Sequence, residues 1–296
     1  TGIRRSGKST LLKLFAKELT RKYKIPKKNI LEINFESGKY NDILDSALLY
    51  DYVKGEIKGI KGKIYLMFDE VQMVKDWERA VNSFSVDFNV DIYITGSNAY
   101  LLSSELSTFL SGRYVEIKML PLSYKEFLVF NNLESNDRNF DLFLRYGGMP
   151  VIDLSTMDEQ VINNALEGIY HTAIFKDIME KNNITDEQLL KNLVLYLADN
   201  IGNISSPNNI TNYLSSNRKH LFSRDSDIGH RTVGSYISAL EKAFIFYPVF
   251  RYDIKGKEYL KTLQKYYIVD TGIRNMLLGY RDVDRGHILE NVVYLE

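Results

Sequence analysis

The residues best suited to chemistry stand at the start of the chain, where Gly2 to Ser9 fit the pattern Gly-x-x-x-x-Gly-Lys-Ser. This pattern is the phosphate-binding P-loop, whose glycines let backbone N–H groups close around phosphate oxygens. We expect Lys8 to reach the β- and γ-phosphates of a nucleotide and the Ser9 hydroxyl to bind Mg²⁺. A helix that begins here would direct its positive dipole end at the same anion. The predicted nucleotide-binding residues are Gly2, Ile3, Arg4, Arg5, Ser6, Gly7, Lys8, Ser9 and Thr10.

A second cluster of candidate residues ends a short apolar run, Ile64 to Phe68, which is followed by Asp69 and Glu70. Such a run is typical of a buried parallel strand that delivers acids to its carboxyl-terminal edge, the segment called Walker B. We predict that Asp69 holds Mg²⁺ directly or through water, and that Glu70 orients and deprotonates the attacking water. The alternative is a strand followed by a solvated acidic turn, which the P-loop upstream disfavours.

Three further side chains could act on the phosphates or on the water. Ser97 and Asn98 follow the next predicted strand, where a hydroxyl or an amide would lie beside the two acids in the role called sensor 1. The alternative for either residue is to cap the helix that follows. Arg113 precedes a further predicted strand and could neutralise charge in the transition state. A structural or surface ion pair is the alternative for this arginine.

The elements that must position these residues alternate along the chain. Predicted strands start near residues 29, 64, 90 and 114, with helical sequence between them. With one more strand expected before the P-loop, the pattern predicts an α/β domain on a five-stranded parallel sheet. A strand between the two motifs, and a glutamate beside Asp69, favour ATPases over GTPases. Because only Thr1 precedes the P-loop and a helix over 288–296 is still running at the other end, we expect both ends to be incomplete.

The alternation of strand and helix patterns stops at Tyr146-Gly147-Gly148-Met149-Pro150. This segment is typical of a helix end and a domain boundary. Residues 155–200 have a helical pattern throughout. The last third predicts helices followed by a two-stranded hairpin, the winged-helix plan, and then a turn at Asp270 into a capped helix. We expect a P-loop ATPase domain at 1–150, a helical lid or linker at 151–200, a winged-helix-like domain at 201–285 and the start of a further domain at 286–296.

A winged helix would allow a second function, because one helix can enter the DNA major groove while the hairpin contacts phosphate. The candidate DNA-binding residues are His230, Arg231, Lys242, Lys255, Lys257 and Lys261. The helix over 230–242 carries few long polar side chains, however, and winged helices also serve as protein-binding or lid modules. Its predicted buried stripe is Val233, Tyr236, Ile237 and Leu240.

The composition limits which partners and which kinds of site we expect for this chain. The 296 residues include 38 Lys plus Arg and 38 Asp plus Glu, so no net charge draws the whole chain to nucleic acid or to an anionic membrane. The absence of cysteine excludes disulfides, thiolate metal sites and a cysteine nucleophile, and suits a reducing cytoplasm. No apolar run approaches the ~20 residues of a membrane span. We therefore expect a cytoplasmic protein with no membrane partner.

Several motifs together resemble one protein family. They are the P-loop with its paired arginines, Asp69-Glu70-Val71-Gln72 with Trp77, Thr95-Gly96-Ser97, Gly112-Arg113-Tyr114, Pro121 to Phe127, Gly147 to Pro150, Val269 to Gly272 and Leu289-Glu290-Asn291. The family consists of uncharacterised bacterial and archaeal AAA-superfamily ATPases with a C-terminal domain of unknown function, and the resemblance covers essentially the whole chain. It implies an AAA-like fold, ATP with Mg²⁺, and the roles given above for the motif residues, but no cellular role. Members usually continue past the last of these motifs into a domain that looks like a restriction endonuclease, which is absent from this sequence.

The leading hypothesis is an ATPase whose nucleotide state is coupled to its C-terminal region. We expect turnover to be slow until a protein partner or a neighbouring subunit of a homo-oligomer completes the site. The rival hypothesis is a DNA-binding regulator in which nucleotide only sets the conformation, and the balanced net charge argues against it. A scaffold with an inactive ATPase is disfavoured because Lys8, Asp69 and Glu70 are all present.

Overall fold

The computed structural model of the protein describes residues 1–97, 112–171, 178–222, 229–253 and 258–296. The chain divides into two compact units. Unit 1 comprises Thr1–Gly2 and Gly7–Met119, and unit 2 comprises Ile3–Ser6 and Leu120–Glu296. Among the described residues, none of the helices combines the length and the apolar character needed to cross a bilayer.

Unit 1 alternates helices with parallel strands. Its elements are α1 (Lys8–Arg21), β1 (Ile30–Asn34), α2 (Ser46–Glu56), β2 (Ile64–Asp69), α3 (Trp77–Asp87) and β3 (Val90–Ile94), with 3-10 turns at Lys27–Asn29, Gly38–Ile43 and Val71–Met73. The three strands are parallel and lie in the order β1-β2-β3. Their register places Asn34 beside Asp69, and Phe68 beside Ile94, so that the strands end together at one edge of the sheet.

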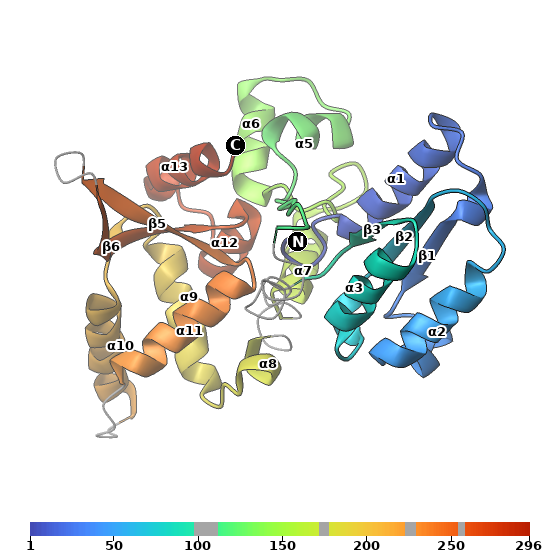
Figure 1. The fold of residues 1–296 in the computed structure, drawn as a ribbon. Helices are drawn as coiled ribbons and strands as arrows, with labels where there is room; N and C mark the ends of the chain where they lie inside the picture. Colours follow the sequence, from blue (N-terminus) through green and yellow to red (C-terminus); the bar gives the residue numbers. More distant parts are fainter. Residues whose placement is uncertain (98–111, 172–177, 223–228, 254–257) are drawn as a thin grey trace. The chain divides into compact units, whose positions relative to one another are not determined.

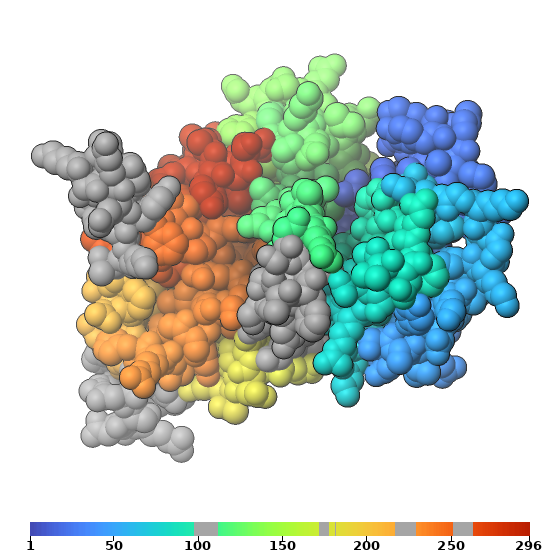
Figure 2. Space-filling model, viewed as in Figure 1, coloured from blue at the N-terminus to red at the C-terminus, as the bar shows by residue number. Residues whose placement is uncertain are grey.

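Alternation along β2 decides which helix covers which face of this sheet. Leu66 and Phe68 lie in a core shared with α2 and α3, whereas Met67 packs with Ala16 and Leu19 of α1. Successive residues of a strand face opposite sides of the sheet, so unit 1 has three layers (Figure 1). Helix α1 forms an outer layer, and its atoms are among the darkest blue in the space-filling view (Figure 2).

The predicted count of five strands is not confirmed, because the described sheet has three. Residues 112–119 contain no strand. The amino group of Thr1 donates to the carbonyl of Ile117 (2.9 Å), and the N–H of Met119 donates to the carbonyl of Thr1 (2.8 Å), which is the pattern of a single parallel bridge. A strand requires a run of such pairs, and Thr1 is the one residue in this sequence that stands before the P-loop.

The described part of unit 2 is helical apart from one small sheet. Its helices are α5 (Tyr124–Phe130), α6 (Asp137–Tyr146), α7 (Glu159–Tyr170), α8 (Glu180–Asn182), α9 (Glu187–Asp199), α10 (Pro207–Phe222), α11 (His230–Lys242), α12 (Thr271–Leu278) and α13 (Arg285–Leu295), with a 3-10 turn at Asp282–Asp284. Its strands are β4 (Ile204–Ser205), β5 (Phe246–Asp253) and β6 (Glu258–Ile268), which pair in antiparallel fashion in the order β4-β6-β5. The predicted apolar stripe of α11 is confirmed, since Val233, Tyr236, Ile237 and Leu240 are all buried.

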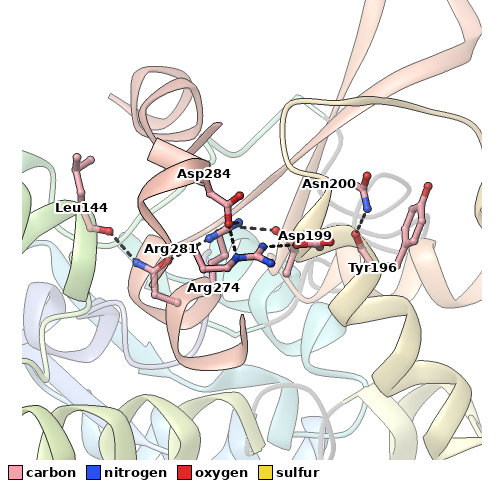
Figure 3. A network of polar contacts seen from close by, with 9 residues as sticks. Leu144, Tyr196, Asp199, Asn200, Arg274, Arg281 and Asp284 are labelled. Atoms are coloured by element: carbon pink, nitrogen blue, oxygen red, sulfur yellow. Dashed lines mark hydrogen bonds and ion pairs between the residues drawn. The ribbon is translucent and has the colours of Figure 1, made fainter. Parts of the chain in front are cut away.

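Arg274 of α12 is fully buried and hydrogen-bonded on two sides (Figure 3). Its Nε donates to the carbonyl of Ala198 (3.1 Å), and its Nη2 donates to Asp284 (2.8 Å). Arg281 donates to the same Asp284 (2.7 Å) and to Asp199 at the end of α9. A buried guanidinium is tolerated only when acceptors satisfy it, so this network holds α12 against the end of α9.

Helix α13 is attached to β6 through the buried side chain of Asn291. Its Oδ1 accepts the N–H of Ile268 (2.8 Å), and its Nδ2 donates to the carbonyl of Ile268 (2.8 Å). These are the two bonds that a residue of a neighbouring antiparallel strand would form. Glu290 strengthens the attachment by accepting hydrogen bonds from Lys265 (2.7 Å) and Tyr267 (2.6 Å).

Candidate functional site

The loop before α1 has a backbone that depends on its glycines. Gly7 adopts a left-handed conformation with φ 96°. Gly2 has φ 144°, and a Cβ at this position would lie 2.2 Å from the main-chain oxygen of Met119. Any other residue at position 2 would therefore collide with the backbone. The two glycines of the motif are required by the geometry of unit 1.

Lys8, the first residue of α1, is buried, and its Nζ donates to the carbonyl of Gly2 (3.0 Å). No acidic residue occupies the first turn of the helix. The ammonium group and the free N–H groups of a helix start both favour an anion. Ser6 is buried, and its Oγ has no hydrogen-bond partner in the described part of the chain. An unpaired buried hydroxyl is unfavourable, and a phosphate oxygen is an acceptor that would satisfy it.

The remaining residues of the loop differ in exposure. Ile3 is buried, Arg4 is half-buried, and Arg5 and Thr10 are exposed. Arg5 adopts φ 62°, a left-handed conformation that is uncommon for a residue with a side chain.

Asp69, at the end of β2, accepts hydrogen bonds from side chains of three different segments. Its Oδ1 accepts from Ser9 Oγ (2.9 Å) and Thr95 Oγ1 (2.5 Å), and its Oδ2 accepts from Asn34 Nδ2 (2.9 Å). The parallel register explains the meeting, because Asn34 ends β1 directly beside Asp69 and Thr95 immediately follows β3. The hydroxyl and the carboxylate predicted to hold Mg²⁺ are therefore in direct contact.

Glu70 is buried and adopts φ 55°, in the left-handed region. Its N–H donates to Thr95 Oγ1 (3.2 Å), and its Oε2 accepts from Ser97 Oγ (3.3 Å) and from Gln72 Nε2. A non-glycine residue held in this conformation costs on the order of 1 kcal/mol, and such residues cluster at functional sites. The turn places the Glu70 carboxylate at the same edge of the sheet as Asp69.

The structure joins four of the predicted residues in one connected set of hydrogen bonds, which runs from Ser9 through Asp69 and Thr95 to Glu70 and Ser97. Arg113 is exposed, and its side chain forms no hydrogen bond or ion pair with any residue in the described ranges. Asn98 lies outside the described residues.

Three contributing residues were not among the predicted site residues, although Thr95 and Gln72 stand in motifs that carry the family resemblance. Asn34 and Thr95 were detectable in principle, because each is a polar residue at or just after the end of a predicted strand, where parallel strands bring their carboxyl ends together. Gln72 gives no such signal. It lies two residues beyond Glu70, in a 3-10 turn, and its amide reaches back to the glutamate.

The donor set fits Mg²⁺ and a nucleotide. Magnesium prefers oxygen ligands, keeps several waters and takes only one or two carboxylates from a protein, and Ser9 with Asp69 offers one hydroxyl and one carboxylate. The unpaired Ser6 hydroxyl and the buried Lys8 ammonium are suited to phosphate.

Comparison with known proteins identifies two families in the chain. Residues 1–128 match the AAA domain, and residues 137–284 match a domain of unknown function (DUF8612). An uncharacterized protein of Haemophilus influenzae is 41% identical over 300 residues, which cover 100% of this chain and 72% of that protein. The uncharacterized protein MJ1544 of Methanocaldococcus jannaschii is 29% identical over 313 residues, which cover 100% of this chain and 65% of that protein.

Among solved structures, the ORC2 protein of Aeropyrum pernix in its ADPNP-ADP complexes is similar, with a TM-score of 0.54. The sequence identity is 11%, and the match covers 99% of this chain and 87% of that chain. At this identity the likeness concerns the fold alone, an α/β fold with a parallel sheet.

Proposed function

The chain belongs to the family of proteins that combine an AAA domain with the domain of unknown function DUF8612, and we propose that it binds and hydrolyses ATP with Mg²⁺. The observation that carries the proposal is the hydrogen-bonded set of Ser9, Asp69 and Glu70 at the carboxyl-terminal edge of the sheet. The AAA domain and the ORC-like fold support a P-loop ATPase.

In this proposal the loop over residues 2–10 binds the phosphates, and the Lys8 ammonium compensates their charge. Ser9 and Asp69 hold Mg²⁺, which when bound supplies further charge neutralisation on the phosphates. Glu70 accepts a hydrogen bond, and then a proton, from the attacking water. Because its Oε2 already accepts hydrogen bonds from Ser97 and Gln72, its Oε1 is the atom that takes the proton.

Further parts of the proposal rest on the sequence. Asn98 contacts the γ-phosphate or the water, and Arg113 neutralises charge in its own or a neighbouring subunit. Turnover is slow until a protein partner or a second copy of the chain completes the site, and the nucleotide state is coupled to the C-terminal region.

Two substitutions test the ATPase. Lys8→Ala removes the ammonium group and is expected to abolish ATP binding in calorimetry. Glu70→Gln keeps the shape of the side chain but cannot accept the proton, so it is expected to bind ATP normally and to lower kcat by about 10²–10⁴-fold. Lys58→Ala and Glu32→Gln are matched controls at exposed positions of unit 1 and should behave as the unmodified protein. Unchanged ATP affinity in Lys8→Ala, or unchanged kcat in Glu70→Gln, would refute the proposal.

A second candidate function is a regulator that binds DNA through a winged helix under the control of nucleotide. It is favoured by the element order α9, β4, α10, α11, β5, β6 and by the three-stranded sheet β4-β6-β5, which are the parts of a winged-helix domain. Of the candidate residues, His230, Arg231 and Lys242 are exposed, Lys261 lies on β6, and Lys255 and Lys257 lie outside the described residues.

Its test is salt-dependent duplex binding that differs between the ATP-bound and ADP-bound protein and is lost when Arg231 and the three hairpin lysines are changed together to glutamine. The same binding with and without nucleotide would exclude control by the ATPase.

A further inference from the structure

The N-terminal part of the chain is strongly basic, although the chain as a whole is balanced. Residues 1–28 contain ten lysines and arginines and one acidic residue, Glu18. Those that follow the P-loop are all exposed, namely Lys13, Lys17, Arg21, Lys22, Lys24, Lys27 and Lys28.

Three of these residues form one line along α1. Lys13, Lys17 and Arg21 are spaced four residues apart, so their side chains lie above one another on the same face of the helix. The opposite face of α1 is occupied, because Ala16 and Leu19 are buried against the sheet. The line therefore runs along the outward face of α1. We call Lys13, Lys17 and Arg21, continued by Lys24, Lys27 and Lys28, the basic stripe.

The charges of the basic stripe are not compensated within the described parts of the chain, where none of its six side chains forms an ion pair or a hydrogen bond. Glu18 is engaged by Lys22 instead (3.1 Å). Like charges four residues apart destabilise a helix by about 0.2–0.5 kcal/mol per pair. This repulsion within the stripe is unfavourable for α1, and a polyanion would offset it.

We propose that the basic stripe binds the phosphate backbone of a duplex nucleic acid without reading its bases. Lys13 and Arg21 are eight residues apart, about 12 Å along a helix axis, and one DNA strand presents roughly three or four phosphates over that length. The stripe is mostly lysine, whose ammonium group suits phosphate as a point charge, and residues 9–28 contain no Asn or Gln that could pair with adenine. Binding through this surface depends on charge and salt, and is insensitive to sequence.

An anionic membrane matches this surface less well. A helix binds at a lipid interface by burying an apolar face, and the apolar face of α1 is already packed against Met67 and its neighbours in unit 1. Leu11 and Leu14 are exposed beside the stripe, but two side chains offer little apolar area for insertion. A row of evenly spaced phosphates suits cations that one helix holds at regular spacing better.

The test measures binding of the full chain to a fluorescent duplex of mixed sequence, about 25 base pairs long, by anisotropy between about 50 and 200 mM salt. The variant carries Lys13→Gln, Lys17→Gln and Arg21→Gln together. Its affinity is expected to fall at least about tenfold, and the slope of log affinity against log salt to lose about three units. The matched control carries Lys54→Gln, Lys58→Gln and Lys61→Gln, three exposed positions of unit 1 with the same total charge change, and is expected to keep the slope.

Four results would overturn the proposal. The first is no duplex binding by the unmodified chain at the lowest salt, and the second is a stripe variant that binds the duplex as tightly as the unmodified chain. The third is a control variant that loses as much affinity as the stripe variant, and the fourth is tighter binding to phosphatidylserine vesicles or to polyglutamate than to the duplex. Thermal unfolding checks that the stripe variant is folded, and it should be no less stable because like-charge repulsion has been removed. The stripe variant should also keep its affinity for ATP, so this proposal and the ATPase proposal can fail independently.

Discussion

Two buried aspartates, Asp69 in unit 1 and Asp270 in unit 2, are stabilised by different kinds of donor. Asp69 accepts from side chains, two hydroxyls and one amide. Asp270 accepts from main-chain N–H groups, those of Gly148 (2.7 Å) and Ile273 (3.0 Å). A side-chain donor can rotate to another partner, whereas a main-chain donor is held by the fold. The comparison teaches that the donors of Asp69 could turn to other partners, as the proposed binding of Mg²⁺ would require, whereas Asp270 serves the architecture.

The surroundings of Asp270 support this distinction. A Cβ on Gly147 would lie 2.3 Å from Asp270 Oδ1, and a Cβ on Gly272 would lie 2.0 Å from the carbonyl oxygen of Tyr146. Burial raises the pKa of Asp270 to about 6, while the N–H groups that point at the carboxylate lower it. The Gly147-Gly148 pair that the sequence marks as a boundary is therefore also the place where α12 meets the end of α6.

The strongest test of the comparison is Asp270→Ala. The change leaves several buried N–H groups without an acceptor, each at a cost of about 1–3 kcal/mol, so we expect a loss of about 3–5 kcal/mol in the free energy of unfolding. Chemical denaturation followed by circular dichroism measures it. Asp282→Ala, at an exposed site nearby, should cost less than about 0.5 kcal/mol. A similar small loss for both variants would show that the buried carboxylate is dispensable.

Gly147→Ala tests the close approach that Asp270 requires. Gly147 has φ 75°, and its new Cβ would collide with the carboxylate, so we expect a loss of about 2–3 kcal/mol. Gly234→Ala in α11 is the matched control, because its Cβ would meet nothing within 4 Å, and it should stabilise the helix by about 0.5–1 kcal/mol. Equal melting temperatures for the two variants would contradict the predicted steric effect.

Glu241 extends the comparison to a carboxylate that has neither kind of donor, because it forms no hydrogen bond with the described residues. Burial raises its pKa to about 7, and Lys242 opposes the shift. The folded chain therefore holds this proton more tightly than the unfolded chain, so stability falls as pH rises from the ordinary pKa of 4.5 to about 7. After allowance for solvent screening, Glu241→Gln should be more stable by about 1 kcal/mol at pH 8 and equally stable near pH 4.

Denaturation of the unmodified protein and the variant across this pH range is the measurement. Glu32→Gln, an exposed change in unit 1, controls for the loss of one negative charge. If the two glutamine variants show the same pH dependence, the predicted effect of burial at Glu241 is wrong.

Asp69→Ala is expected to cost less stability than Asp270→Ala. Ser9 and Asn34 are half-buried and can bond to water once the carboxylate is gone, whereas the buried Thr95 hydroxyl loses its acceptor, so the cost should be about 1–2 kcal/mol. ATP hydrolysis should nevertheless be lost, which a phosphate-release assay measures. A cost as large as that of Asp270→Ala would remove the distinction between the two aspartates.

Much of unit 1 could be predicted from local patterns. The run that ends in Asp69 was predicted as a buried strand, and this prediction is confirmed. Such a strand can be recognised from residue type within a short window. The strand predicted near residue 114 could not be recognised in this way. A strand forms only where a neighbouring segment pairs with it, and a local sequence pattern does not show that neighbour.

Contacts between distant segments could not be predicted in the same way. The cap at Asp270 was predicted as a local helix start and is confirmed, since its Oδ1 accepts the N–H of Ile273. Its second bond, to Gly148, spans 122 residues, and no spacing in the sequence indicates it. The contact of Gln72 with Glu70 could not be predicted either, because it depends on the conformation of the turn between the two residues. Patterns locate polar residues at strand ends, but only the packed chain shows which of them touch.

The paired bonds between Asn291 and Ile268 bear on how this protein can be shortened for laboratory work. They cover the N–H and C=O of one β6 residue on the side away from β5. A fragment that stops before Asn291 would leave this stretch of strand open, and open strand edges recruit strands from other molecules. Such fragments are expected to aggregate, so α13 belongs in any version of unit 2 that is produced alone.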